Sequence, residues 1–126
     1  MGITGADFVA IPSTDWRRSR AFYVETLGLR PDERSEAEFW VGETCFAIWE
    51  PASFGMEFAP QHNGHIALHA DDVAATRADL EAKGVEFVGE TMDSSVCHMA
   101  FFRDPDGNDL MLHCRYAPHE DDRAAS

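Results

Sequence analysis

The stretch Phe8-Val9-Ala10-Ile11-Pro12-Ser13-Thr14-Asp15 has the same pattern as His65-Ile66-Ala67-Leu68-His69-Ala70-Asp71-Asp72. Each stretch is a short β-prone run followed by aspartate, a residue that favours the N-cap of a helix. Apolar residues at helical spacing follow each aspartate, and a glycine then stands at the expected helix end, Gly28 in the first half and Gly84 in the second. The same order of elements therefore occurs twice, which predicts two copies of one supersecondary unit.

Three further β-prone runs follow each predicted helix, so the expected order is βαβββ, twice, in an α+β fold. The alternative is a generic α+β domain whose halves resemble each other by chance. We expect one domain over residues 1–118, with module one at about 3–58, module two at about 63–117, and an acidic tail at 119–126. The expected runs are 30–34, 36–41 and 44–50 in the first half, and 85–90, 96–103 and 109–115 in the second.

The net charge and the cysteine content limit the partners and the cellular setting that we expect for this chain. The chain has 126 residues, with 10 Lys+Arg against 23 Asp+Glu and a net charge of −13. So acidic a chain disfavours nucleic acid and anionic membrane surfaces as partners, and it favours a cationic one. The longest apolar run, Cys45-Phe46-Ala47-Ile48-Trp49, is far too short to span a bilayer. Three cysteines without a close pair indicate a reducing, cytoplasmic setting.

Three segments together resemble a known family. Asp15–Leu29 is similar to the first helix of the glyoxalase, bleomycin-resistance and extradiol-dioxygenase proteins, the vicinal oxygen chelate superfamily. Asp71–Phe87 is similar to its second helix and following strand, and Phe102–Asn108 to the turn before its last strand. The resemblance covers residues 3–117. It implies an open β-cup made by two βαβββ modules, and small-molecule ligands bound by homodimers.

The resemblance also implies four positions that hold a divalent metal in the metal-dependent members. They match Phe8, Ala47, His65 and Met111 here, so one imidazole remains where His, Gln or Glu is usual. Phenylalanine and alanine have no donor atom, and a thioether suits soft copper better than zinc or nickel. We therefore expect no metal cofactor and no metal-dependent glyoxalase or dioxygenase activity.

Other side chains could rebuild a metal site. Alternation along a strand places His65 with His69, and Asp109 with His113, on the face that carries Met111. His65 and His69 are about 13 Å apart along a strand, too far to share one ion, so the possible pairs are His65 with Asp109 and His69 with His113. Cys45 and Cys97 share the alternation of the cup, although a buried, unreactive thiol is the simpler interpretation of each.

These observations leave three functions open. The first is a binding module that holds a small organic molecule, a cation being favoured, in a cup without a metal. The second is a lyase or dioxygenase-like enzyme that uses a rebuilt metal site or His65 as a metal-free base. The third is a domain with no small-molecule role. The residues expected to line the cup are Phe8, Ala47, Trp49, His65, His69, Met99, Phe101, Met111 and His113.

Overall fold

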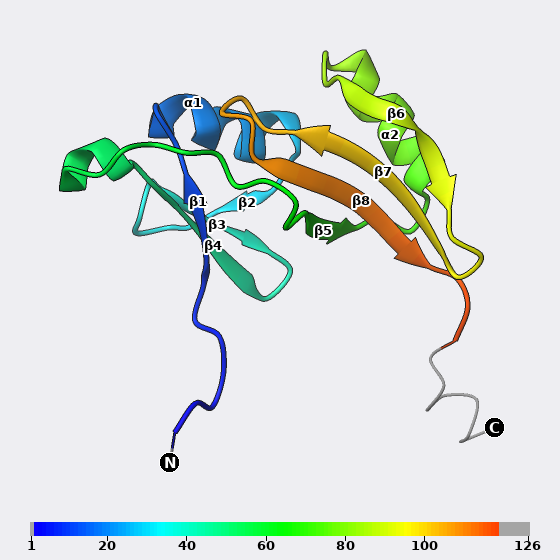
Figure 1. Cartoon of the computed structure of the whole chain (residues 1–126), viewed down its shortest axis with the longest axis horizontal. Helices are drawn as coiled ribbons and strands as arrows, with labels where there is room; N and C mark the ends of the chain where they lie inside the picture. The colour runs from blue at the N-terminus through cyan, green and yellow to red at the C-terminus, as the bar shows by residue number, and fades with distance from the viewer. Residues whose placement is uncertain (1, 119–126) are drawn as a thin grey trace. The chain divides into compact units, whose positions relative to one another are not determined.

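The computed structural model describes residues 2–118, so the predicted acidic tail at 119–126 lies outside the described residues. The chain forms two compact units (Figure 1). One unit holds the chain up to Gly64 together with Asp104–Asn108, and the other holds His65–Arg103 and the chain from Asp109 onward. Over the described residues, no helix has the length and apolar character needed to cross a membrane.

The first unit is built on an open four-stranded sheet with the strand order β1-β4-β3-β2. Strand β4 lies parallel to β1 and antiparallel to β3, which is antiparallel to β2. Its elements are β1 (Val9–Pro12), α1 (Trp16–Arg20), η1 (Ala21–Thr26), β2 (Arg30–Pro31), β3 (Glu38–Val41), β4 (Thr44–Trp49) and η2 (Pro51–Phe54).

The second unit repeats this arrangement in an open sheet with the order β5-β8-β7-β6. Strand β8 lies parallel to β5 and antiparallel to β7. The predicted α+β fold and its repeated order of elements are therefore confirmed. The elements are β5 (Ile66–His69), α2 (Val73–Ala82), β6 (Phe87–Asp93), β7 (Cys97–Arg103) and β8 (Asp109–Arg115).

Each sheet buries one face beneath its helical segment. In the first unit, the buried Tyr23 of η1 stacks on Phe39 of β3 with ring centroids 4.7 Å apart, and Phe39 packs on Phe46 of β4. In the second unit, the buried side chains come from alternate strand positions and from Val73 and Leu80 of α2. Because side chains alternate along a strand, the opposite face of each sheet, which we call its open face, carries the half-buried Ala47 and Trp49 in the first unit and Met99, Phe101 and Met111 in the second. The buried strand residues of the second unit include Leu68, Ala100, Phe102, Leu110 and Leu112.

Both predicted N-caps are confirmed. The Asp15 side chain accepts a hydrogen bond from the backbone N–H of Arg18, and Asp72 accepts one from that of Ala75. Gly84 follows α2 with φ of 93°, as its position after the last turn requires. The two halves thus begin their helices by the same local mechanism.

The first helix differs from the expectation of a regular α-helix. Its α-helical part ends at Arg20 and continues as the π-helical segment η1, in which the N–H of Leu27 donates to the carbonyl of Phe22 at 2.9 Å. Such wide turns are rare and have no simple sequence signal. The segment after β4 contains the short 3₁₀ turn η2, which Pro51 begins and Gly55 closes with φ of 72°.

The turn Asp104–Asn108, which we call the clasp loop, packs against the rest of the first unit. Asp106 accepts hydrogen bonds from both the backbone N–H and the hydroxyl of Thr14, from Arg18 at 2.8 Å and from the Ser19 hydroxyl at 2.6 Å. The Asn108 amide donates to the Pro12 carbonyl at 2.9 Å. Residues of the second sequence repeat thus complete the first unit.

These hydrogen bonds predict that stability depends on acidity. Burial raises the pKa of Asp106, but the hydrogen bonds from Ser19 and Thr14 outweigh it and lower that pKa to about 2. A carboxyl whose pKa is lower in the folded chain stabilises the fold above its ordinary pKa of 3.8 and loses that contribution as the pH falls toward 2.

We therefore expect urea midpoints to fall between pH 4 and pH 2 in the wild type and to fall less in Asp106→Asn. Comparing denaturation curves of the two proteins across this range measures the difference. Equal slopes for both proteins would contradict the assignment.

Candidate functional site

The open face of the first sheet holds two of the predicted cup residues in its strands. Ala47 of β4 pairs with Ala10 of β1, on the side opposite the buried Phe46 and Ile48. Trp49 follows two positions later on the same side and contacts the ring of Phe54, with centroids 6.1 Å apart. Phe8 directly precedes β1 and is 57% exposed.

The open face of the second sheet brings most of the other predicted residues together. Met111 of β8 pairs with Ala67 of β5 on one side and with Phe101 of β7 on the other. His113 pairs with both His69 and Met99 in the next row. The predicted neighbourhood of the first and last strands of this module is confirmed. The result is an apolar surface of thioether and aromatic groups with imidazoles at its margin.

His65 stands at the start of this surface. Its Nε2 lies 3.9 Å from Oδ2 of Asp109, while Oδ1 of Asp109 accepts a hydrogen bond from Nε of Arg103 at 2.9 Å. The imidazole packs edge-on against Phe101 at a centroid distance of 5.2 Å, and 28% of the side chain is exposed. The pair that strand alternation suggested is thus present, and the imidazole can reach a bound molecule.

His69 is placed differently. Its Nε2 lies 2.7 Å from a carboxylate oxygen of Asp71, and both side chains are well exposed. Although His69 and His113 are register partners, the imidazole of His69 is held by Asp71. This arrangement favours a role at the rim of the surface.

The side chains present do not fit the metal that the family resemblance implies. The four matched positions supply one imidazole, at His65, and one thioether, at Met111. Within residues 2–118, no three His, Cys, Asp or Glu side chains lie close enough together to hold a metal ion. His65 and Asp109 offer two donors, and one oxygen of Asp109 already binds Arg103. A tight divalent site needs three or four such ligands.

The cysteines match the simpler interpretation of unreactive thiols. Cys45 and Cys97 are buried, and all three cysteines are free. Burial, followed by the nearby carboxylates of Glu38 and Asp32, raises the pKa of the Cys45 thiol. A nucleophilic cysteine needs the opposite shift, because the thiolate is the reactive form.

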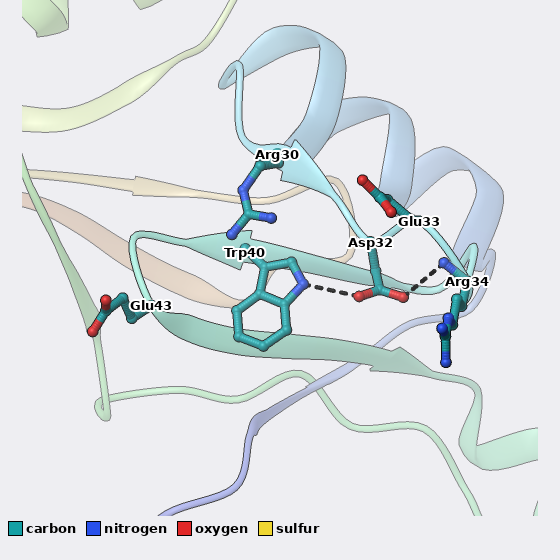
Figure 2. A pocket seen from close by; sticks show the side chains of 6 residues that line it. All are labelled: Arg30, Asp32, Glu33, Arg34, Trp40 and Glu43. Carbon is teal, nitrogen blue, oxygen red and sulfur yellow. Dashed lines mark hydrogen bonds between the residues drawn. The ribbon is translucent and has the colours of Figure 1, made fainter.

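A pocket beside β2 and β3 contains functional candidates that the sequence analysis missed (Figure 2). Trp40 of β3 pairs with Arg30 of β2 and Cys45 of β4, so it shares the open face with Ala47. The tight turn at Gly42, with φ of 59°, fixes this register and is the signal that could have revealed it. The cavity has a volume of about 440 Å³ and is lined by Arg30, Asp32, Glu33, Arg34, Trp40 and Glu43.

Comparison with known proteins agrees with this architecture. A member of the glyoxalase, bleomycin resistance protein and dioxygenase superfamily from Sphaerobacter thermophilus DSM 20745 has the same fold, with a TM-score of 0.74 at 23% identity over 90% of this chain and 98% of that one. TnmS3, an antibiotic binding protein from Streptomyces sp. CB03234, superposes with a TM-score of 0.69 at 26% identity, over 89% of this chain and 96% of its own.

A sequence relative from Vibrio parahaemolyticus carries the name "Probable lactoylglutathione lyase" and is 30% identical over 110 residues, 74% of this chain and 78% of that protein. The model of the Glyoxalase/Bleomycin resistance protein/Dioxygenase superfamily matches residues 5–112. On this match over most of its length, the chain belongs to the Glyoxalase/Bleomycin resistance protein/Dioxygenase superfamily.

Proposed function

We propose that this protein binds a small organic molecule on the open faces of its sheets and that it does so without a metal ion. The observation that carries the proposal is the open face of the second sheet, where Met99, Phe101 and Met111 adjoin the half-buried His65. Apolar and aromatic side chains with a few polar groups are typical of small-molecule sites, and thioethers adapt to irregular ligands.

The charge of the chain favours a cationic ligand. With a net charge of −13, the protein attracts cations over a distance of about one Debye length, roughly 8 Å at physiological salt. A cation that reaches the open face can also interact with an aromatic ring, which adds about 0.5–2 kcal/mol. The antibiotic-binding relative supports a binding role for this architecture at 26% identity.

The proposal is tested by calorimetric titration with metal-free bleomycin, chosen because the family includes bleomycin resistance proteins. The protein is first dialysed against a chelator, and its content of zinc, nickel, iron and manganese is measured. We expect saturable binding that chelation does not change and far less than one metal ion per chain. Stoichiometric metal whose removal abolishes binding would contradict the metal-free proposal, and a titration without heat or saturation would contradict drug binding.

His65→Ala is expected to weaken this binding by about 1–3 kcal/mol, because a bound polar group would lose its hydrogen-bond partner. The melting temperature should change little, since the imidazole is partly exposed and lies at the edge of the sheet. His98→Ala is the matched control, because His98 follows Cys97 in β7 and points to the opposite side from Met99. A lower melting temperature with unchanged affinity would assign His65 a structural role.

Catalysis is a second candidate, favoured by the pairing of His65 with Asp109. A nearby carboxylate orients an imidazole, so His65 would be placed to accept a proton from a bound substrate. The relative named as a lactoylglutathione lyase suggests the substrate to test. Turnover of lactoylglutathione, followed by the absorbance of its thioester, should then fall in both His65→Ala and Asp109→Asn. No turnover above background in the chelated wild type would remove this candidate.

A further inference from the structure

The pocket beside β2 and β3, which we call the Trp40 pocket, contains an aromatic ring that is held in one orientation. The indole N–H of Trp40 donates to Oδ1 of Asp32 at 2.9 Å (Figure 2). The other oxygen of Asp32 accepts the backbone N–H groups of Arg34 at 3.0 Å and Ser35 at 2.8 Å. The carboxylate is therefore fixed by the backbone, and it fixes the ring in turn. A ring that needs no reorientation loses little entropy when a ligand stacks on it.

A cation already lies over this ring. The guanidinium carbon of Arg30 is 5.5 Å from the indole centroid, close to the outer limit of about 6 Å for such an interaction. Arg30 is exposed, and in the described part of the chain its side chain makes no hydrogen bond or ion pair with another residue. The guanidinium is thus held weakly, and a better-placed cation can displace it.

The carboxylates around the ring outnumber the cations. Asp32, Glu33 and Glu43 line the pocket with Arg30 and Arg34. The indole and backbone hydrogen bonds lower the pKa of Asp32, so it is charged at neutral pH. When the Arg30 side chain moves off the ring, the carboxylates exceed the remaining cation at the ring by two. The pocket then favours a positive charge.

We propose that the Trp40 pocket binds a flat aromatic cation, whose ring stacks on the indole and whose positive charge takes the place of the Arg30 guanidinium. Asp32, Glu33 and Glu43 line the pocket that receives this charge. This inference rests on the proposed small-molecule function and names the chemical class and the place of recognition. The volume of about 440 Å³ is within the usual range for ligands of drug size.

The test uses proflavine, a flat aromatic cation, titrated by calorimetry into the intact chain. Trp40→Ala should weaken binding about tenfold, and Glu43→Gln about threefold, the latter effect shrinking as salt is added. Arg30→Gln should strengthen binding several-fold, because it removes the competing cation. A purely structural role for these residues would not produce this gain.

Trp16→Ala is the matched control, since Trp16 is also half-buried and carries the Arg17 guanidinium at 4.5 Å from its ring. Its affinity should equal that of the wild type. Trp40→Phe, checked by thermal melting, covers the case in which Trp40→Ala does not fold. Tetramethylammonium, a cation without an aromatic ring, should bind at least tenfold more weakly than proflavine.

The outcomes separate the two proposals. Proflavine affinity that depends on His65 but not on Trp40 overturns the pocket assignment and leaves the proposed function in place. Weaker binding in Arg30→Gln, equal binding of tetramethylammonium, or no saturable proflavine binding also overturns it. Loss of bleomycin binding with retention of Trp40-dependent proflavine binding contradicts the drug-binding proposal alone.

Discussion

Asp106→Ala should lower the free energy of unfolding by about 3–5 kcal/mol, because it removes a buried carboxylate that accepts hydrogen bonds from Thr14, Arg18 and Ser19, and a hydrogen bond to a charged group contributes about 1.5–3 kcal/mol. The Asp106 side chain is fully buried. Its removal takes away the acceptor that these donors share and loosens the clasp loop from the rest of the first unit. Urea denaturation followed by circular dichroism measures the loss.

Two variants sharpen this test. Asp106→Asn keeps the shape of the side chain but not its charge, so its loss should lie between those of Asp106→Ala and the wild type. Asp71→Ala removes an aspartate whose side chain is 99% exposed and binds the exposed His69, and it should change stability by less than about 0.5 kcal/mol. A loss below about 1 kcal/mol in Asp106→Ala would show that the clasp loop contributes little.

Phe39→Ala is expected to have a comparable effect, about 3–5 kcal/mol, because it opens a cavity in the core of the first unit. Phe39 is completely buried and touches two other rings, those of Tyr23 and Phe46. Thermal melting of the variant should therefore show a strongly reduced midpoint.

Phe54→Ala is the corresponding control, as the same truncation at a side chain that is 72% exposed. It should shift the melting midpoint only slightly, since little apolar area leaves the core. Similar midpoints for the two variants would mean that the core around Phe39 can close after truncation.

The sequence predicted helices and strands correctly where a local interaction, such as a helix cap, or the alternation of side chains determines them. Asp15 and Asp72 cap helices because a short carboxylate reaches the backbone N–H three residues later. The strands of the second sheet followed from alternation, which also placed Met99, Phe101 and Met111 on one side. The exact course of η1 was not predictable, because a π-helical turn depends on tertiary packing of its side chains rather than on propensity.

Long-range contacts account for what the sequence did not reveal. The aspartates and the asparagine of the clasp loop are residue types that form turns, and the sequence gives no reason to expect another role. The structure shows that Asp106 also binds Thr14. Trp40 lies in a predicted strand, but only its pairing with Arg30 places a cation over its ring. Interactions between distant residues of this kind are not encoded in the periodicity of a single segment.

The clasp loop has a consequence for the order of events during synthesis. Thr14 and Asp106 lie 92 positions apart, so the first unit is incomplete until residue 106 has left the ribosome. Synthesis adds about 5–20 residues per second, so residues 1–64 are made several seconds before the clasp loop. During that time Thr14, Arg18 and the Pro12 carbonyl lack their hydrogen bonds to the loop. The clasp loop, which is made late in the second repeat, therefore sets when the first repeat becomes native.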